Sequence, residues 1–144
     1  MEPEEIFDGV LDNTVYRDKQ VGEAGVHLTV GSVHDVLKGG QTDFGGDEQV
    51  PCETEKLTPQ KRDPDDDYGW WDLTAGHYRV QFNETLVESG KAFLLVPNDR
   101  ILACGCSLAG TVVSSGVIDT VLTVPMHGVS IKENARIAML CSLG

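Results

Sequence analysis

The sequence predicts an all-β protein, a distorted barrel or sandwich with one short N-terminal helix. Many short segments alternate apolar and polar residues, which is the two-residue period of a half-buried strand. Turn residues separate these segments every several positions, and only the N-terminus shows helical spacing. The length of 144 residues is that of one domain, so we treat residues 1–144 as a single unit.

The N-terminal region predicts one helix and two strands. Apolar residues recur at helical spacing over residues 4–12, behind acidic residues that favour a helix N-terminus. Residues 15–19 have the composition of a connection. The segment Val26–Val30 alternates cleanly between apolar and polar residues, and a second strand, Ser32–Leu37, is expected after Gly31.

Residues 41–68 are the most irregular part of the chain. They contain prolines, paired glycines and an acidic run, so we expect a long loop excursion with one short strand near Cys52–Leu57. Ordered structure should resume just after this loop. Adjacent residues of a strand face opposite sides, so one of Trp70 and Trp71 should lie in the core and the other at the surface.

The C-terminal half predicts strands around a loop of small residues. Strand-like segments occupy residues 78–87, 92–96, 100–103, 120–124, 129–131 and 136–140. Between them, Cys104–Gly110 is a loop without large side chains, which lets the backbone approach a ligand closely. The same composition also suits a tight turn that binds nothing.

Charge and composition narrow the possible functions. A formal net charge of −12 argues against a nucleic-acid or anionic-membrane partner, since both require clustered Lys and Arg. No stretch approaches the roughly 18 apolar residues of a membrane span. The acidic N-terminus does not resemble a signal peptide, so we expect a cytoplasmic, reducing compartment. Cys104 and Cys106 are interpreted as small buried residues rather than metal ligands.

Four segments, in order, resemble the trimeric dUTPase and dCTP deaminase superfamily, particularly small dUTPases of its dCTP-deaminase-like branch. They are Gln20–Gly31, the Leu-Thr-Ala-Gly-His-Tyr segment from Leu73, Val96–Ala109 and Ile131–Leu140. The third resembles the family's Ser-Ser-Leu-x-Arg phosphate loop, and the fourth its Ile-x-x-Gly-x-Arg-Ile-Ala-Gln-Leu segment.

The resemblance implies a β-clip barrel that assembles as a homotrimer and binds a deoxynucleoside triphosphate, dUTP or dCTP, with Mg²⁺. It implies phosphate binding by Gly105, Cys106, Ser107 and Arg136. Asp119 would be the catalytic carboxylate that orients the attacking water. The implied reaction is hydrolysis of dUTP to dUMP and diphosphate.

The chain also departs from the family pattern. Gly110 stands where the phosphate loop has arginine, His27 where the first segment has aspartate, and Met139 where the last has glutamine. Two placements of Gly116–Asp119 are open. If Gly116–Asp119 is the family's Gly-Val-Ile-Asp motif, Asp119 is positioned for catalysis. If Gly116 instead corresponds to the glycine that follows that motif, Asp119 lies in the next strand.

Three hypotheses follow for the function. The first is a dUTP hydrolase. The second is a catalytically degenerate relative that serves as a nucleotide-binding, regulatory or structural trimer. The third sets the family aside and takes the chain as a β-barrel interaction module that uses Trp70 and Trp71 as an aromatic anchor.

Overall fold

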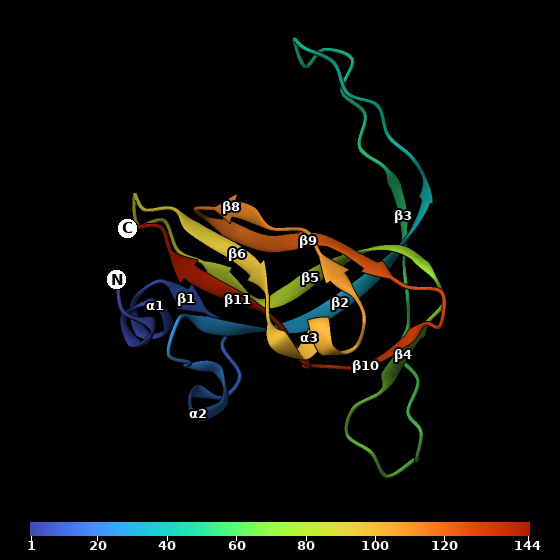
Figure 1. The fold of residues 1–144 in the computed structure, drawn as a ribbon, viewed down its shortest axis with the longest axis horizontal. Coiled ribbons are helices and arrows are strands. Elements are labelled where there is room, and N and C mark those ends of the chain that lie inside the picture. Colours follow the sequence, from blue (N-terminus) through green and yellow to red (C-terminus); the bar gives the residue numbers. More distant parts are fainter.

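The computed structural model describes residues 1–144, and strands dominate it as predicted (Figure 1). In chain order the elements are α1 (Pro3–Gly9), β1 (Leu11–Asp12), α2 (Arg17–Gln20), β2 (Val26–Lys38), β3 (Glu53–Lys56), β4 (Trp70–Leu73), β5 (Gly76–Leu86), β6 (Phe93–Pro97), α3 (Asp99–Ala103), β7 (Ser107–Leu108), β8 (Thr111–Val113), β9 (Gly116–Val124), β10 (Val129–Lys132) and β11 (Arg136–Ser142).

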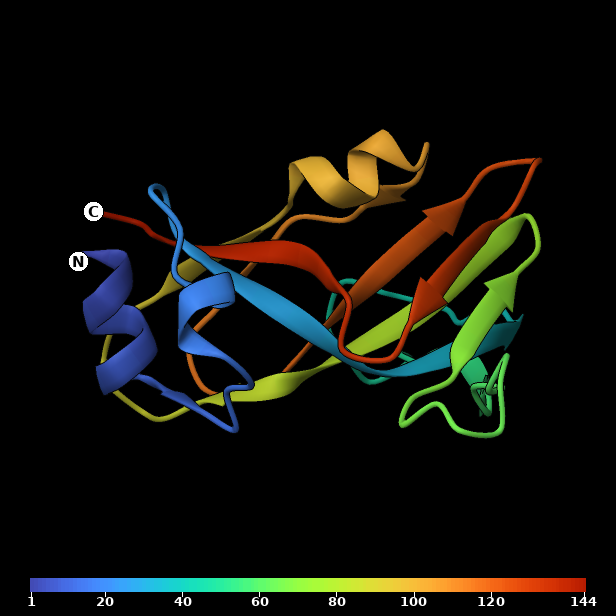
Figure 2. The same cartoon turned by 90° about the horizontal axis from the view of Figure 1, so that it is seen from below.

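One antiparallel sheet makes up most of the molecule. Its strand order is β7-β9-β5-β2-β11-β6-β8, with β1 paired to β5 and β3 paired to β2. The long strands β2 and β5 twist strongly, so the sheet curls and its two ends approach one another (Figures 1 and 2). Strands β4 and β10 form a separate two-stranded ladder beside it. This confirms the predicted distorted barrel.

Strand β2 is continuous, so the two strands predicted on either side of Gly31 are one. The pairing of β2 with β5 shifts register between Val30 and Ser32, which marks a bulge at Gly31. A Cβ atom at Gly31 would lie 2.7 Å from Oδ1 of Asn83. Glycine therefore lets β5 approach closely here, and the strand bends without ending.

The helices differ from the prediction in number and length. The predicted helix over residues 4–12 ends at Gly9, although Val10 and Leu11 are buried as its pattern required. A second helix, α2, occupies the predicted connection over residues 15–19. The segment 100–103, predicted as a strand, belongs to α3, because Asn98 caps a helix there.

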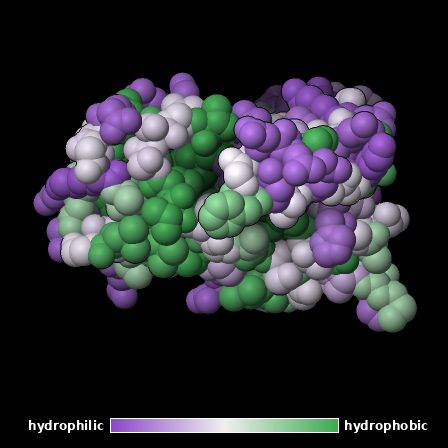
Figure 3. Space-filling view, turned by 90° about the horizontal axis from the view of Figure 1, so that it is seen from above, coloured by the Kyte–Doolittle hydropathy of each residue, from purple (hydrophilic) through white to green (hydrophobic).

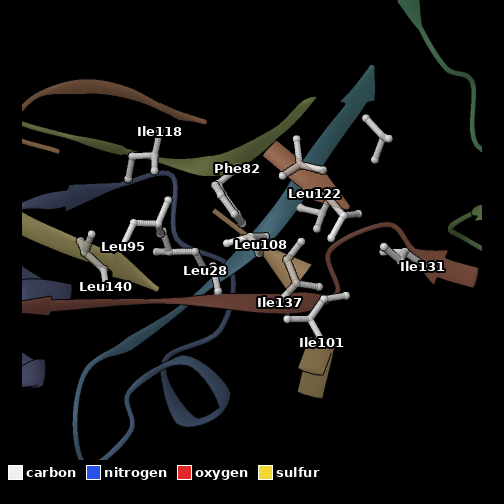
Figure 4. Packing of buried hydrophobic residues seen from close by; sticks show 14 of the residues in the cluster. Leu28, Phe82, Leu95, Ile101, Leu108, Ile118, Leu122, Ile131, Ile137 and Leu140 are labelled. Atoms are coloured by element: carbon white, nitrogen blue, oxygen red, sulfur yellow. The ribbon is translucent and has the colours of Figure 1, made fainter. Parts of the chain in front are cut away.

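The core is one cluster of apolar side chains inside the curled sheet (Figure 4). Alternate residues of β5, from Tyr78 to Leu86, point into it as the pattern predicted. Trp71 is 3% exposed, whereas Trp70 is half-buried at the surface, where the Arg62 guanidinium lies 3.8 Å above its ring. The prediction that the two tryptophans face opposite sides is confirmed.

The irregular region 41–68 projects from the body as predicted, and its expected short strand is β3. We call residues 39–52 the arm. It extends far beyond the sheet as a narrow hairpin (Figure 1). It leaves at the C-terminal end of β2 and returns at the start of β3, where Lys38 and Glu53 are paired. No helix is long and apolar enough to cross a membrane.

The surface on the side of the arm is segregated by polarity. Figure 3 shows hydrophobic residues gathered in one band and hydrophilic residues over much of the remaining view. Exposed apolar side chains of the neighbouring strands include Val112 in β8 and Val117 in β9. Strand β8 is also the last strand of its sheet and pairs only with β6, so one of its edges is free.

Candidate functional site

A cavity of about 790 Å³ opens between α3 and the turn that joins β10 to β11. Half of its fourteen lining residues are hydrophobic. We call it the α3 cavity. Its lining comprises Trp70, Asp99, Arg100, Ile101, Ala103, Cys104, Ser130, Ile131, Lys132, Glu133, Asn134, Ala135, Arg136 and Ile137. Its size suits a small organic ligand.

Positive charge gathers in this cavity although the chain carries a net charge of −12. Three cations, Arg100, Lys132 and Arg136, line it beside two carboxylates. Burial, and then the neighbouring Arg100, lower the pKa of Arg136 from its usual value. Both arginines line the same cavity. Adjacent like charges of this kind are typical of sites that bind anions.

His27 lies behind these arginines and is neutral at pH 7. Burial lowers its pKa first, followed by the charges of Arg136 and Arg100. Its Nδ1 atom lies 3.2 Å from Nδ2 of Asn98, which donates to it when the ring proton is on Nε2. His27, at the family's aspartate position, therefore contributes neither a carboxylate nor a full positive charge to the region of the cavity's arginines.

Asn98 fixes one wall of the cavity by beginning α3. Its Oδ1 accepts a hydrogen bond of 3.1 Å from the amide of Ile101, a side-chain N-cap. Its Nδ2 donates to the carbonyl of Arg136 at 3.0 Å. One buried side chain therefore ties the helix to the strand that carries the cavity's arginine.

The predicted phosphate loop follows α3 directly. The amides of Cys104, Gly105 and Cys106 donate to carbonyls of Ile101 and Leu102 at 3.2, 3.0 and 3.4 Å. These hydrogen bonds complete the last turn of the helix. The three amides are thus engaged within the chain, while the Ser107 side chain is exposed at the start of β7.

Gly105 has φ +86°, a conformation that favours glycine, and it reverses the chain between α3 and β7. Cys106 then points into the core, and burial raises the pKa of its thiol. Cys104 is exposed and lines the α3 cavity. The prediction that both cysteines are buried is wrong for Cys104, because it lies at a helix end rather than in a strand.

The turn before Arg136 forms the opposite wall. Asn134 adopts φ +66° and stands where the resembling family segment has glycine. Asparagine tolerates this conformation better than most residues. Its Oδ1 accepts a 2.7 Å hydrogen bond from Nδ2 of Asn83. The substitution therefore keeps the turn and adds a side-chain contact to β5.

A buried carboxylate is linked to that turn through hydrogen bonds of Thr29 and Asn83. Glu84 is 0% exposed, and its oxygens accept hydrogen bonds from the Thr29 amide at 2.9 Å, from the Thr29 hydroxyl at 2.6 Å and from Gln20 Nε2 at 2.8 Å. Burial raises its pKa, although these donors favour the charged form. Sequence analysis missed Glu84, but the alternation of β5 places it on the inward face.

Asp119 lies apart from these groups, in the middle of the uninterrupted strand β9. Its carboxylate is 3.0 Å from the guanidinium of Arg79. Both residues line a second cavity of about 720 Å³ between the sheet and the base of the arm. Strand β9 continues from Asp119 to Val124 without a turn, and both placements of Gly116–Asp119 stay open.

One chain does not bring all the predicted residues together. Ser107 is paired with Thr123 on β9. Asp119 precedes Thr123 by four residues of this strand, roughly 13 Å at about 3.3 Å per residue. Of the predicted phosphate-binding residues only Arg136 lines the α3 cavity; Gly105, Cys106 and Ser107 follow the lining residue Cys104 in the chain but do not line it. Asp119 belongs to the cavity at the base of the arm.

The chain contains no group of three or more His, Cys, Asp or Glu that could hold a metal ion. The α3 cavity offers only the carboxylates of Asp99 and Glu133. Mg²⁺ commonly binds through one or two carboxylates together with waters and substrate phosphates. The donor set fits an ion delivered with a phosphate ligand and does not fit a resident all-protein site.

Comparison with known proteins gives relatives along most of the chain. No protein-family model matches it. A protein of Aeropyrum pernix named "Probable deoxyuridine 5'-triphosphate nucleotidohydrolase" is 30% identical over 122 residues, which cover 81% of this chain and 71% of that protein. A protein of the same name from Methanosarcina mazei is 28% identical over 136 residues, covering 91% of this chain and 76% of that protein.

A solved structure with a similar fold is 2'-deoxycytidine 5'-triphosphate deaminase from Agrobacterium tumefaciens. The superposition has a TM-score of 0.60 at 12% sequence identity and covers 90% of this chain. The chain spans 41% of the length of that deaminase chain. At this identity the likeness concerns the fold alone.

Proposed function

The chain belongs to the deoxyuridine 5'-triphosphate nucleotidohydrolase family, and from this premise we propose that it hydrolyses dUTP to dUMP and diphosphate. The observation that carries the proposal is the gathering of Arg100, Lys132 and Arg136 in one cavity of an acidic protein. The four relatives are all named as nucleotidohydrolases, so the alternative of a non-catalytic trimer is not favoured.

We propose that the α3 cavity takes the triphosphate. Arg136 and Arg100, which line the cavity, pair with phosphate oxygens as charged donors. Ser107 is exposed and follows the lining residue Cys104 closely in the chain, which makes its hydroxyl a further candidate donor. Because the amides of Gly105 and Cys106 are engaged by α3, these two residues contribute mainly by shaping a loop that passes close to the phosphates. Mg²⁺, when bound with the triphosphate, offsets its negative charge.

Asp119 is the proposed carboxylate that orients water for attack on the α-phosphorus. In this reaction the water oxygen bonds to phosphorus, the bond to the bridging oxygen of the diphosphate breaks, and diphosphate leaves. The Arg79 guanidinium 3.0 Å from Asp119 fixes the direction of the carboxylate. A carboxylate positioned in this way can accept a hydrogen bond from the water.

A homotrimer would reconcile the separation between Asp119 and the phosphate loop. In such an assembly the Asp119 of one subunit can face the α3 cavity of its neighbour, so that each site is shared. A heterologous contact repeated around a threefold axis closes into a ring. Four free cysteines are consistent with a reducing, cytoplasmic compartment, which we also propose.

Diphosphate release from a panel of deoxynucleoside triphosphates with Mg²⁺ tests the proposal. We expect dUTP to be the preferred substrate. Replacing Ser107 by Ala should lower kcat/KM by about 10- to 100-fold through loss of a hydrogen bond to a charged group. Replacing Asp119 by Asn should lower kcat by about 100-fold or more.

The exposed carboxylate of Asp12 provides a matched control, since Asp12→Asn changes the same group at a residue that lines neither cavity. Activity that survives both Ser107→Ala and Asp119→Asn would show that the assigned residues are wrong. Absence of diphosphate release from every nucleotide would show that the proposed reaction is wrong.

A further inference from the structure

The arm is a preformed structure held by its own hydrogen bonds. Gln41 and Val50 exchange backbone hydrogen bonds of 2.9 Å near its middle. Beyond them, the carboxylate of Asp43 accepts from the amides of Gly46 at 3.1 Å and Glu48 at 3.0 Å. These contacts close the tip, residues 43–48, into a defined turn. Little conformational entropy would therefore be lost if the tip bound a partner.

The tip presents an aromatic side chain that this chain does not cover. Phe44 has a relative exposure of 108%, the highest among the large apolar residues. Figure 1 shows the arm leaving the body on the side away from α3, so neither the sheet nor the α3 cavity of the same chain can bury it. Single exposed apolar residues are common, but a large ring at the end of an ordered projection is suited to intermolecular contact.

The chemistry of the tip specifies its partner. Asp43, Asp47 and Glu48 flank Phe44 in the sequence of the tip, so a complementary surface must combine an apolar recess with positive charge. The α3 cavity has both properties. Half of its lining is hydrophobic, and Arg100, Lys132 and Arg136 supply the charge.

We infer that the arm tip of one copy of this chain docks into the α3 cavity of a second copy, with Phe44 in the recess and the acidic residues against its cations. Such a contact is heterologous, because tip and cavity are different surfaces, and repeating it generates a closed ring when the rotation is suitable. The inference goes beyond dUTP hydrolysis and stands independently of it.

One consequence concerns ligands of the same cavity. The tip and a polyphosphate would use the same cations, so they compete. A bound arm therefore limits access to the cavity, and a triphosphate releases the arm. Inorganic tripolyphosphate is the probe for this competition, since it carries the phosphates without any base.

Disulfide trapping tests the contact, because the exposed Cys104 already lines the α3 cavity. The variant Gly45→Cys keeps Phe44, and a Cβ atom at position 45 meets nothing within 4 Å. Incubated with oxidised glutathione, it should form a covalent species between chains. Mass spectrometry of the joined peptides should identify position 45 and Cys104 as the partners. Tripolyphosphate should lower the yield about fivefold or more, as expected for competition over a charged site.

Met126→Cys is the matched control, since Met126 is 82% exposed on a different turn. It should not react with Cys104 of another chain. Absence of cross-linking in Gly45→Cys, or reaction with a different cysteine, would overturn the inference.

Sedimentation of charge variants gives a second test that needs no oxidation. Phe44→Ser should weaken self-association by about tenfold or more, as expected for removal of an aromatic anchor. Asp47→Lys and Lys132→Glu should each weaken it, and the double variant should recover part of the loss. Unchanged association in Phe44→Ser, or no recovery in the double variant, would contradict the docking.

Discussion

Glu84 links three parts of the molecule through one buried carboxylate. It binds Thr29 on β2 and Gln20 at the end of α2, and its neighbour Asn83 binds Asn134 in the turn of the α3 cavity. Polar residues buried together in this way must all be satisfied, and no buried side-chain N or O atom lacks a partner. The geometry of the cavity therefore depends on a residue that does not touch it.

Replacing Glu84 by Gln should reveal a pH-dependent contribution to stability. Burial raises the folded-state pKa above the unfolded value of about 4.3, so the folded state binds more protons between the two pKa values. The stability due to Glu84 is complete below about pH 4.3 and decreases as pH rises through the raised pKa.

Denaturant unfolding of both proteins from pH 4 to pH 8 measures this effect. The cost of Glu84→Gln should be about 1–3 kcal/mol at low pH and should become smaller as pH rises. Glu23→Gln, at an exposed position, controls for the general effect of charge. A cost that is independent of pH, or that grows with pH, would contradict the assignment.

At the scale of elements, α3 shows where sequence patterns do and do not determine structure. The alternation in β5 predicted its inward residues, because a long strand samples the two-residue period several times. Helix α3 has only five residues, fewer than are needed to display helical periodicity, and its apolar residues resemble a strand. Asn98 was the available signal, because asparagine is a strong helix N-cap.

The sequence predicted only part of the candidate site, because local sequence order does not specify how distant segments pack together. The resemblance pointed to the loop and Arg136, since local sequence order carries that information, and of these residues only Arg136 lines the α3 cavity. It could not reveal that Arg100 and Lys132 join Arg136 in one cavity, because this depends on the packing of α3 against β11. Nor could it reveal the distance from Asp119, which follows from the strand register.

Asn98 should be more important for the cavity than its capping role alone implies. Asn98→Ala removes both the cap and the hydrogen bond to the Arg136 carbonyl, and should destabilise the protein by about 2–3 kcal/mol. Asn98→Asp keeps the cap but lacks the donor.

Chemical denaturation and titration with tripolyphosphate separate the two roles. We expect Asn98→Asp to retain more stability than Asn98→Ala while binding tripolyphosphate more weakly than the wild type. If Asn98→Asp binds as well as the wild type, the link from Asn98 to Arg136 has no influence on the cavity.

At the scale of the whole molecule, the separation of Asp119 from the phosphate loop has a direct consequence for assembly. If a complete site takes Asp119 from one subunit and Ser107 from another, two inactive variants can complement one another. A mixture of Asp119→Asn and Ser107→Ala, allowed to exchange subunits, should contain some sites with neither substitution.

Diphosphate release from the mixture should therefore exceed that of either variant, and should approach about a quarter of the wild-type rate for random exchange of equal amounts. Each variant alone, taken through the same subunit-exchange procedure, is the control. No gain after verified exchange would show that the two residues act in the same subunit or in different functions.

The arm begins and ends at a single rung of the sheet, the pairing of Lys38 with Glu53. The hydrogen bonds within the hairpin join residues of the hairpin to one another, so the pairing of the barrel strands does not depend on the length of the hairpin. Descendants of one ancestor could lengthen, shorten or exchange the tip, residues 43–48, acquiring new neighbours while leaving the cavity that contains Asp119 untouched.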